Sequence, residues 1–227
     1  MKRYVAELAG TFILVYFAVG SAVFAIDKIG AMGVALTFGL VLAALAHGIG
    51  PVSGCHVNPA VTLGVFASGR MRAAEAAGYV GAQLVGGVAG AALLKLTLSV
   101  GEITDRTKAL GSNGFGSAVN GTGAFLLEAL LTMLVVLTYL LVTDRVALGH
   151  ATAPAVGTAL AAASLVGLPL TGASVNPARS VGPALFAGGE RLDQLWLFVA
   201  APLSGAVLAV AVAAGIHHSR TAGENVR

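Results

Sequence analysis

An eight-residue segment occurs twice in this chain, and both copies end in the tripeptide Asn-Pro-Ala. Residues 53–60 read SGCHVNPA and residues 171–178 read TGASVNPA, so five of the eight paired positions are identical. Asparagine is a strong helix N-cap, and proline at the first helical position loses no hydrogen bond. Each copy therefore predicts a helix start that follows a glycine-containing extended stretch. The two motifs comprise Asn58, Pro59, Ala60, Asn176, Pro177 and Ala178.

An extended stretch before a helix start presents backbone carbonyls in a row. Here these carbonyls would form two ladders of hydrogen-bond acceptors for water, and the amides of Asn58 and Asn176 would each donate to a passing oxygen. Both helix N-termini carry partial positive charge, which opposes a cation or a hydronium ion but not a neutral molecule. The pattern favours the passage of water over ions, without a catalytic step. The predicted ladder positions are Gly54, Cys55, His56, Gly172, Ala173 and Ser174.

The composition places these motifs in a lipid bilayer. Of the 227 residues, 57% are hydrophobic and 10% are charged, whereas soluble domains carry about 25% charged residues. The mean hydropathy is +0.88. The net charge of +3 comes from scattered lysines and arginines, which do not indicate a nucleic-acid site. A single cysteine excludes an intramolecular disulfide and a multi-cysteine metal site, so we expect no metal and no cofactor.

A helix that spans a bilayer needs about 20 largely apolar residues. Six stretches meet this criterion, and two apolar segments that begin at the Asn-Pro-Ala motifs are about half as long. Irregular backbone at membrane depth is tolerated only where it is buried in protein or lines a cavity. The two short helices would therefore enter from opposite faces and meet near the midplane. The predicted spans are 4–26, 30–49, 73–100, 122–143, 151–168 and 192–217, and the short segments are 58–68 and 176–187.

Each half of the chain contains three spans and one motif. Because three is odd, the second copy has to enter from the opposite face, which makes an inverted repeat of about 1–115 and 116–227. The predicted fold is an all-α membrane protein, a single channel domain over 1–227 with six transmembrane helices plus two re-entrant half-helices. The distribution of positive charge favours two cytoplasmic termini. The inner charges are Lys2, Arg3, Arg70, Arg72, Arg145, Arg220 and Arg227; the outer ones are Lys28, Arg106, Lys108 and Arg191.

Three charged side chains fall inside the predicted membrane segments. Glu7 and Glu128 occupy equivalent places near the starts of the first and fourth spans. Paired carboxylates could form a proton relay, but their symmetric placement favours buried acceptors for the N–H groups of the re-entrant loops. Arg179 follows the second motif directly. We therefore expect Arg179 to line the pore rather than to extend to the outer interface.

These features resemble the aquaporin, or major intrinsic protein, family over nearly the whole chain. The resemblance rests on the paired Asn-Pro-Ala motifs, the segment 176–180 (NPARS), the Glu7-x-x-Gly10-Thr11 start and the GAQ segment 81–83. It is nearest to the short prokaryotic water channels of that family. It implies a homotetramer with one pore per subunit that is permeable to water and small neutral solutes. Compact loops, few cysteines and short tails favour a prokaryotic plasma (inner) membrane.

The resemblance also implies an outer constriction of four positions, which here are Phe38, Ser164, Ala173 and Arg179. Water-selective members usually have Phe, His, a small residue and Arg, so Ser164 stands where a histidine is usual. A register shift would bring Ala163 or Leu165 there instead. A filter without histidine is wider, which keeps ammonia, metalloid acids and glycerol open as solutes. Glycerol-conducting members usually carry Asp after the motif arginine, whereas this chain has Ser180.

Other functional classes fit the sequence less well. An intramembrane enzyme needs a nucleophile–base pair or a metal cluster at membrane depth, and the sequence pattern offers neither. A coupled transporter needs more ionisable residues near its substrate, and a scaffold would use longer tails than those expected here. The predicted external loop, 101–121, contains the glycosylation pattern Asn120-Gly121-Thr122, whose use the sequence leaves open.

Overall fold

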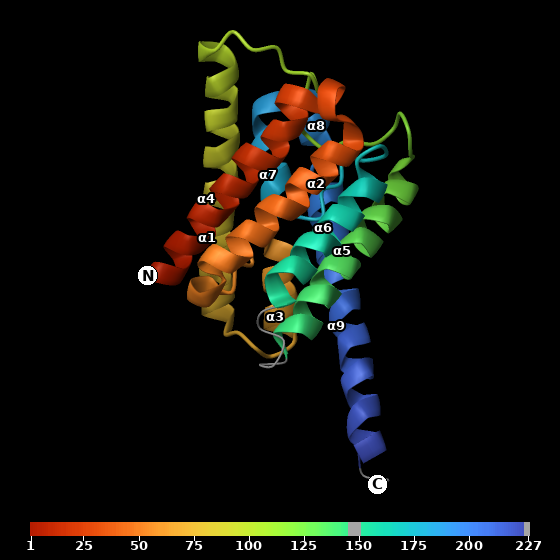
Figure 1. The fold of residues 1–227 in the computed structure, drawn as a ribbon. Helices are drawn as coiled ribbons and strands as arrows, with labels where there is room; N and C mark the ends of the chain where they lie inside the picture. Colours follow the sequence, from red (N-terminus) through yellow and green to blue (C-terminus); the bar gives the residue numbers. More distant parts are fainter. Residues whose placement is uncertain (145–150, 225–227) are drawn as a thin grey trace.

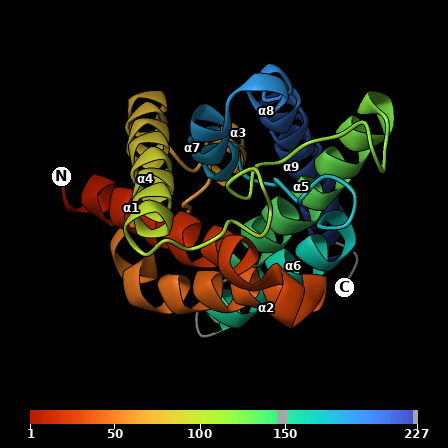
Figure 2. The same cartoon turned by 90° about the horizontal axis from the view of Figure 1, so that it is seen from above.

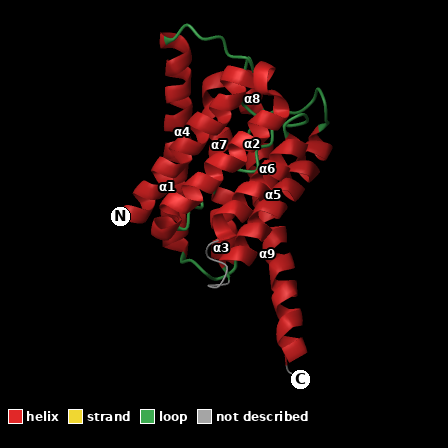
Figure 3. Ribbon diagram, in the orientation of Figure 1, coloured by secondary structure: helices red, strands yellow, loops and turns green. Residues whose placement is uncertain are grey.

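The computed structural model describes residues 1–144 and 151–224, with side chains up to residue 216 (Figure 1). Helices and connecting loops make up this part of the chain, which contains no β-strand (Figure 3). The all-α prediction is therefore confirmed for the described residues. Of the charges used for the orientation, Arg145, Arg220 and Arg227 lie outside the described side chains.

The helices follow the order of the predicted spans. Residues 2–53 form one helical run that is broken at Gly30, whose φ of 64° and ψ of 177° are accessible essentially to glycine alone. This run therefore contains the first two predicted spans. The elements are α1 Lys2–Ile13, the π-helix η1 Leu14–Val19, α2 Gly20–Ser53, α3 Pro59–Ala67, α4 Ala73–Val100, α5 Gly121–Thr143, α6 Thr152–Gly167, α7 Pro177–Ala187, α8 Gly189–Asp193 and α9 Leu197–Glu224.

The length and surface of the long helices suit a bilayer. Among the described residues, Lys2–Ser53, Ala73–Val100, Gly121–Thr143 and Gly189–Ile216 are long and apolar enough to cross a membrane. With the break at Gly30 and the shorter apolar helix α6, they occupy the positions of the six predicted spans. Large aliphatic side chains such as Leu40, Val85 and Leu126 are exposed on the outside. Such a surface belongs in hydrocarbon rather than in water.

The last predicted span, 192–217, begins later than the prediction placed it. α8 ends at Asp193, a turn follows, and α9 begins at Leu197. In this turn the side chain of Gln194 accepts a hydrogen bond from the N–H of Phe115 at 2.8 Å and donates to the Phe115 carbonyl at 3.0 Å. These bonds fasten the turn to the long loop. Hydrophobic periodicity does not encode such a long-range contact.

The two halves pack through equivalent contacts. α1 packs against α4, α5 packs against α9, and α2 and α6 meet each other. α3 contacts α9 and α7 contacts α4, so each short helix lies against the last long helix of the other half. Seen from above, α3 and α7 lie between α4 and α9 (Figure 2). Small residues permit close approach, since a Cβ added to Gly39 would lie 2.6 Å from the carbonyl oxygen of Gly157.

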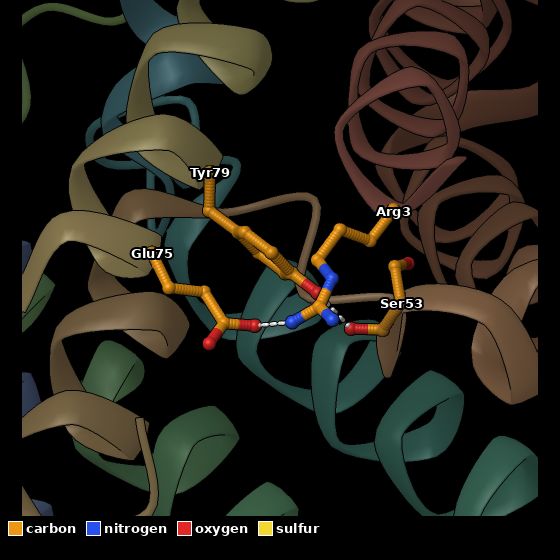
Figure 4. Close-up of polar contacts among 4 residues, drawn as sticks. All are labelled: Arg3, Ser53, Glu75 and Tyr79. Carbon is orange, nitrogen blue, oxygen red and sulfur yellow. Dashed lines mark hydrogen bonds and ion pairs between the residues drawn. The ribbon is translucent and has the colours of Figure 1, made fainter. Parts of the chain in front are cut away.

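Charged residues gather at opposite ends of α4. At its start, Arg3 of α1 forms an ion pair with Glu75, and the Tyr79 hydroxyl donates to the Ser53 carbonyl at 2.9 Å (Figure 4). These contacts join the beginning of α1, the beginning of α4 and the end of α2. Beyond the other end of α4, Arg106 pairs with Asp27 at 3.7 Å. The charged groups thus lie at the two ends of a long apolar helix, where the membrane surfaces are expected.

Candidate functional site

Both motifs follow the same unusual backbone. α2 ends at Ser53; its C-cap residue Gly54 has φ 85°, and Cys55 and Val57 also have positive φ values of 54° and 44°. The second copy repeats the pattern at Gly172 (81°), Ala173 (49°) and Val175 (56°). Positive φ is rare for a β-branched residue and costs roughly 1–3 kcal/mol. Surrounding contacts have to hold these segments in place.

A buried glutamate holds each segment. Glu7 accepts hydrogen bonds from the N–H groups of His56 at 2.9 Å and Val57 at 2.6 Å. Glu128 accepts the two equivalent bonds in the second copy, both at 2.9 Å. Both side chains are fully buried. Because the N–H and C=O of a trans peptide point in opposite directions, these bonds turn the preceding carbonyls away from the glutamates.

Four carbonyls of the predicted ladders have no hydrogen-bond donor among the described residues. They belong to Cys55, His56, Ala173 and Ser174. The other two predicted positions are occupied: the Gly54 carbonyl accepts the Tyr139 hydroxyl at 2.9 Å, and the Gly172 carbonyl accepts Nη2 of Arg179 at 3.3 Å. Two free acceptors therefore precede each motif, one fewer per ladder than the sequence predicts.

The two motif asparagines each reach the loop of the other half. Oδ1 of Asn58 caps α3 at the N–H of Ala60, and Nδ2 donates to the Val175 carbonyl at 2.9 Å. Oδ1 of Asn176 caps α7 in the same way, and its Nδ2 donates to the Val57 carbonyl at 2.8 Å. A side-chain amide has two N–H donors. No described residue accepts the second one, so each asparagine keeps a donor for another oxygen.

A small internal cavity adjoins the two asparagines. Its volume of about 20 Å³ exceeds the roughly 10–15 Å³ that one water molecule needs. The lining combines the hydrogen-bonding groups with aliphatic side chains that offer water no partner. The residues around it are Leu14, Phe38, Leu42, His56, Val57, Asn58, Val61, Val135, Leu160, Ser174, Asn176 and Arg179.

The guanidinium of Arg179 closes one side of this cavity. Only 2% of the residue is exposed. Its Nη1 donates to the Gly111 carbonyl at 2.9 Å, and Cζ lies 5.3 Å from the centre of the Phe38 ring. A cation over an aromatic face is attracted by the ring quadrupole. The Nε atom has no partner among the described residues. The structure thus brings together Arg179 and Phe38, two of the four predicted filter residues.

Asn113, in the long loop before α5, is a site residue that the sequence analysis missed. Its Oδ1 accepts hydrogen bonds from Nη1 of Arg179 at 2.9 Å and from Oγ of Ser180 at 2.7 Å. Its Nδ2 donates to the Thr171 carbonyl at 3.2 Å. The side chain is 2% exposed. Its neighbourhood, Ser-Asn-Gly, is ordinary turn chemistry, so no local signal distinguishes this asparagine from a solvated one.

The remaining predicted filter residues, Ser164 and Ala173, are buried but are not among the residues that line the cavity. Ser164 is 1% exposed on α6, and Ala163 is fully buried, whereas Leu165 is 45% exposed and points outward. A register shift to Leu165 is therefore wrong. The residue of α6 that lines the cavity is Leu160, one turn before Ser164. Ala173 packs against α6 close to Gly167, where an added Cβ would lie 3.0 Å from the Ala173 Cβ.

Comparison with known proteins matches residues 1–213 to the major intrinsic protein family. The chain is 45% identical over 217 residues to Aquaporin Z of Rhodopseudomonas palustris, covering 91% of this chain and 90% of that protein. It is 44% identical over 216 residues to Aquaporin Z of Bradyrhizobium diazoefficiens, with 92% and 90% coverage. It is also 40% identical over 213 residues to glycerol uptake facilitator protein-like 6 of Lactiplantibacillus plantarum, with 92% and 95% coverage.

The fold has a counterpart among solved structures. The aquaglyceroporin from Plasmodium falciparum superposes with a TM-score of 0.83 at 21% identity, covering 92% of this chain and 93% of that one. That similarity concerns the fold. The sequence match covers both halves of the chain and both motifs. The matching arrangement of helices covers them as well. The chain therefore belongs to the major intrinsic protein family.

Proposed function

We propose that this protein is a passive channel for water that excludes ions and protons. The observation that carries the proposal is the pair of amides, Asn58 and Asn176, each with a free donor at the cavity. The family consists of channels rather than enzymes, and two relatives with 44–45% identity are named Aquaporin Z.

The hydrogen-bond geometry explains how water would pass. A water molecule at the cavity accepts from the asparagine donors and donates to the unpaired carbonyls on either side. Aliphatic neighbours such as Leu42 and Val135 offer it no other partner. A water that accepts from both amides has its protons directed outward, so a continuous proton wire is interrupted there. The N-termini of α3 and α7 add positive potential that opposes cations.

The roles of the individual residues follow from these contacts. Glu7 and Glu128 act as structural acceptors that aim the carbonyl ladders. Of the predicted ladder residues, Cys55, His56, Ala173 and Ser174 offer free carbonyls to water, whereas the carbonyls of Gly54 and Gly172 accept hydrogen bonds from Tyr139 and Arg179. Phe38, Ser164, Ala173 and Arg179 form the outer filter, in which Arg179 supplies the charge and the Nε donor that has no partner among the described residues.

The test is stopped-flow light scattering on proteoliposomes under a sucrose gradient. The Asn176→Asp variant keeps the helix cap but loses both N–H donors of Nδ2, the one to the Val57 carbonyl and the one left for water. Water permeability should therefore fall at least about tenfold, the effect of one hydrogen bond of about 1.4 kcal/mol. Asn120→Asp is the matched control, because Asn120 caps α5 at the surface, away from the cavity. Wild-type vesicles that shrink no faster than empty ones, with folded protein present, would contradict the proposal.

A wider range of small uncharged solutes is the second candidate. Ser164 is small where water-selective relatives usually carry histidine, and one relative is named a glycerol uptake facilitator-like protein. Re-swelling of the same vesicles in glycerol measures this directly. We expect Ser164→His to reduce glycerol entry severalfold and to change water permeability less. Glycerol entry that is already absent in the wild type would leave water as the principal permeant.

We further propose a homotetramer of single-domain subunits in the plasma membrane, with both termini cytoplasmic. The repeats of about 1–115 and 116–227 then lie in opposite orientations. Exposed aliphatic side chains on several helices supply the apolar faces that subunit contacts and lipid both need. Native mass spectrometry gives the subunit number, and the accessibility of a tag placed before Lys2 in intact cells gives the orientation.

A further inference from the structure

A second hollow lies on the lipid-facing side of the short helices, away from the pore. This groove has a volume of about 400 Å³ and is bounded by α3, α4, α7 and α9. Figure 2 shows these four helices side by side, with α3 and α7 between α4 and α9. The groove residues are Pro59, Thr62, Leu63, Phe66, Ala76, Ala77, Val80, Leu84, Pro177, Val181, Val199 and Leu203. It reaches the back of both Asn-Pro helix starts.

The groove offers an occupant no hydrogen bond. Thr62 is its sole polar side chain, and the Thr62 hydroxyl donates to the Asn58 carbonyl at 3.1 Å and accepts from Gln83 at 2.9 Å. A cavity without polar partners does not hold water. Left empty, its walls would lose their dispersion contacts. An aliphatic chain is the occupant that suits this lining.

The wall that α4 contributes to the groove is about as long as one leaflet of a bilayer is thick. Its α4 wall runs from Ala76, one turn inside the start of that helix, to Leu84. Eight helical steps are about 12 Å, close to half of the roughly 30 Å hydrocarbon core. Pro59 and Pro177, where the two short helices begin, lie along the groove, which continues past Pro177 to Val181 and to Val199 near the start of α9. An acyl chain from the leaflet on the Arg3 side would therefore fill the part of the groove that lies between the surface and the two helix starts.

A cationic side chain, Arg72, lies at the surface end of the groove, where the headgroup of a lipid in the groove would be. Ala76, Val80 and Leu84 are spaced by four residues along α4 and share one face of it. Arg72 is the N-cap of the same helix, four residues before Ala76, at the surface end of this face. Arg72 is exposed and has no hydrogen bond or ion pair from its side chain to a described residue. Arg72 suits a phosphate group at the surface, and the apolar groove below it suits an aliphatic chain. A phospholipid contains both groups.

We propose that this groove binds one phospholipid, with an acyl chain against the back of the two pore helices and its phosphate at Arg72. The site is distinct from the water path and takes a different class of ligand. It also puts lipid in contact with the turns that position the motif asparagines.

The experiment uses phosphatidylglycerol that carries a diazirine midway along one acyl chain, in proteoliposomes of phosphatidylethanolamine and phosphatidylglycerol. After illumination, labelled positions are mapped by peptide mass spectrometry. We expect label at Leu63 and Val181, which are partly buried in the groove, in addition to the exposed reference positions Val85 and Val207. Water permeability, measured on the same vesicles, reports the fold independently of the label.

Three variants make the assignment specific. Ala77→Phe fills the groove and should lower labelling at Leu63 at least fivefold relative to Val85, whereas the matched Ala74→Phe, exposed on the same helix outside the groove, should not. Arg72→Gln should lower it about fivefold, since one cation near an anionic surface contributes about 1 kcal/mol. Label confined to the reference positions would overturn the proposal, whether the groove is empty or covered by a second copy of the chain. Unchanged labelling at Leu63 in both Ala77→Phe and Arg72→Gln would also overturn it.

Discussion

Replacing Asn113 with alanine tests whether the long loop anchors the filter arginine. The substitution removes the acceptor for Nη1 of Arg179 and for the Ser180 hydroxyl, and the donor to the Thr171 carbonyl. A hydrogen bond to a charged group contributes about 1.5–3 kcal/mol and a neutral one about 0.5–1.5 kcal/mol. Because these bonds share one side chain, we expect a combined loss of about 3 kcal/mol rather than the full sum.

Two measurements follow from that loss. For a chain of this length, about 3 kcal/mol lowers the apparent unfolding temperature in detergent by about 6–12 °C at a fixed scan rate. The freed guanidinium keeps only its two backbone acceptors, at Gly111 and Gly172. It can then move out of the filter, so the ratio of glycerol to water permeability should rise at least threefold.

Asn120→Ala is the matched control in the same loop. Its side chain is exposed and caps α5 by accepting the N–H of Gly123 at 2.8 Å. Loss of such a cap costs about 1 kcal/mol, or about 2–4 °C, and should leave the solute ratio unchanged. If Asn113→Ala behaves like Asn120→Ala in both measurements, the loop does not hold Arg179 and the reasoning is wrong.

Two further substitutions address how the pore helices are held. Gly87→Val should greatly reduce the yield of folded protein on size-exclusion chromatography, because a Cβ at position 87 collides with a carbonyl oxygen of α7. Gly81→Val is the control on the same helix and should be tolerated, because the space around Gly81 is open. Glu7→Leu leaves two loop N–H groups buried without an acceptor, at about 1–3 kcal/mol each. It should lower the unfolding temperature more than Glu7→Gln, which retains one acceptor oxygen; equal effects of the two variants would show that the carboxylate does not hold the loop.

Features set by local chemistry were predictable from the sequence, and long-range contacts were not. Asparagine and proline fix the beginnings of α3 and α7 through cap and backbone preferences, so α3 begins at Pro59 and α7 at Pro177, within a residue of the predicted starts. Asn113 and Gln194 each act on a segment that is distant in sequence, which periodicity cannot indicate. The sequence analysis also missed that Leu160 is the residue of α6 that lines the cavity. The reason is related, because the rotation of a helix around its axis depends on its neighbours.

The internal repeat also shows where the two halves differ. In the first half, Thr62 bonds to His56 at 3.1 Å and accepts from Gln83 of α4 at 2.9 Å. In the second half, the equivalent pair Ser180 and Ser174 lies at 2.6 Å.

The third partner in the second half comes from a loop rather than from a membrane helix. It is Asn113, which Ser180 contacts at 2.7 Å. The same Oδ1 atom of Asn113 also accepts from Arg179. Gln83 donates to Glu7 of α1 and to Thr62 of α3, so it joins membrane helices to one another, whereas Asn113 joins α7 to the long loop before α5. The Arg179 guanidinium is thus held at the point where the second half departs from the symmetry of the first.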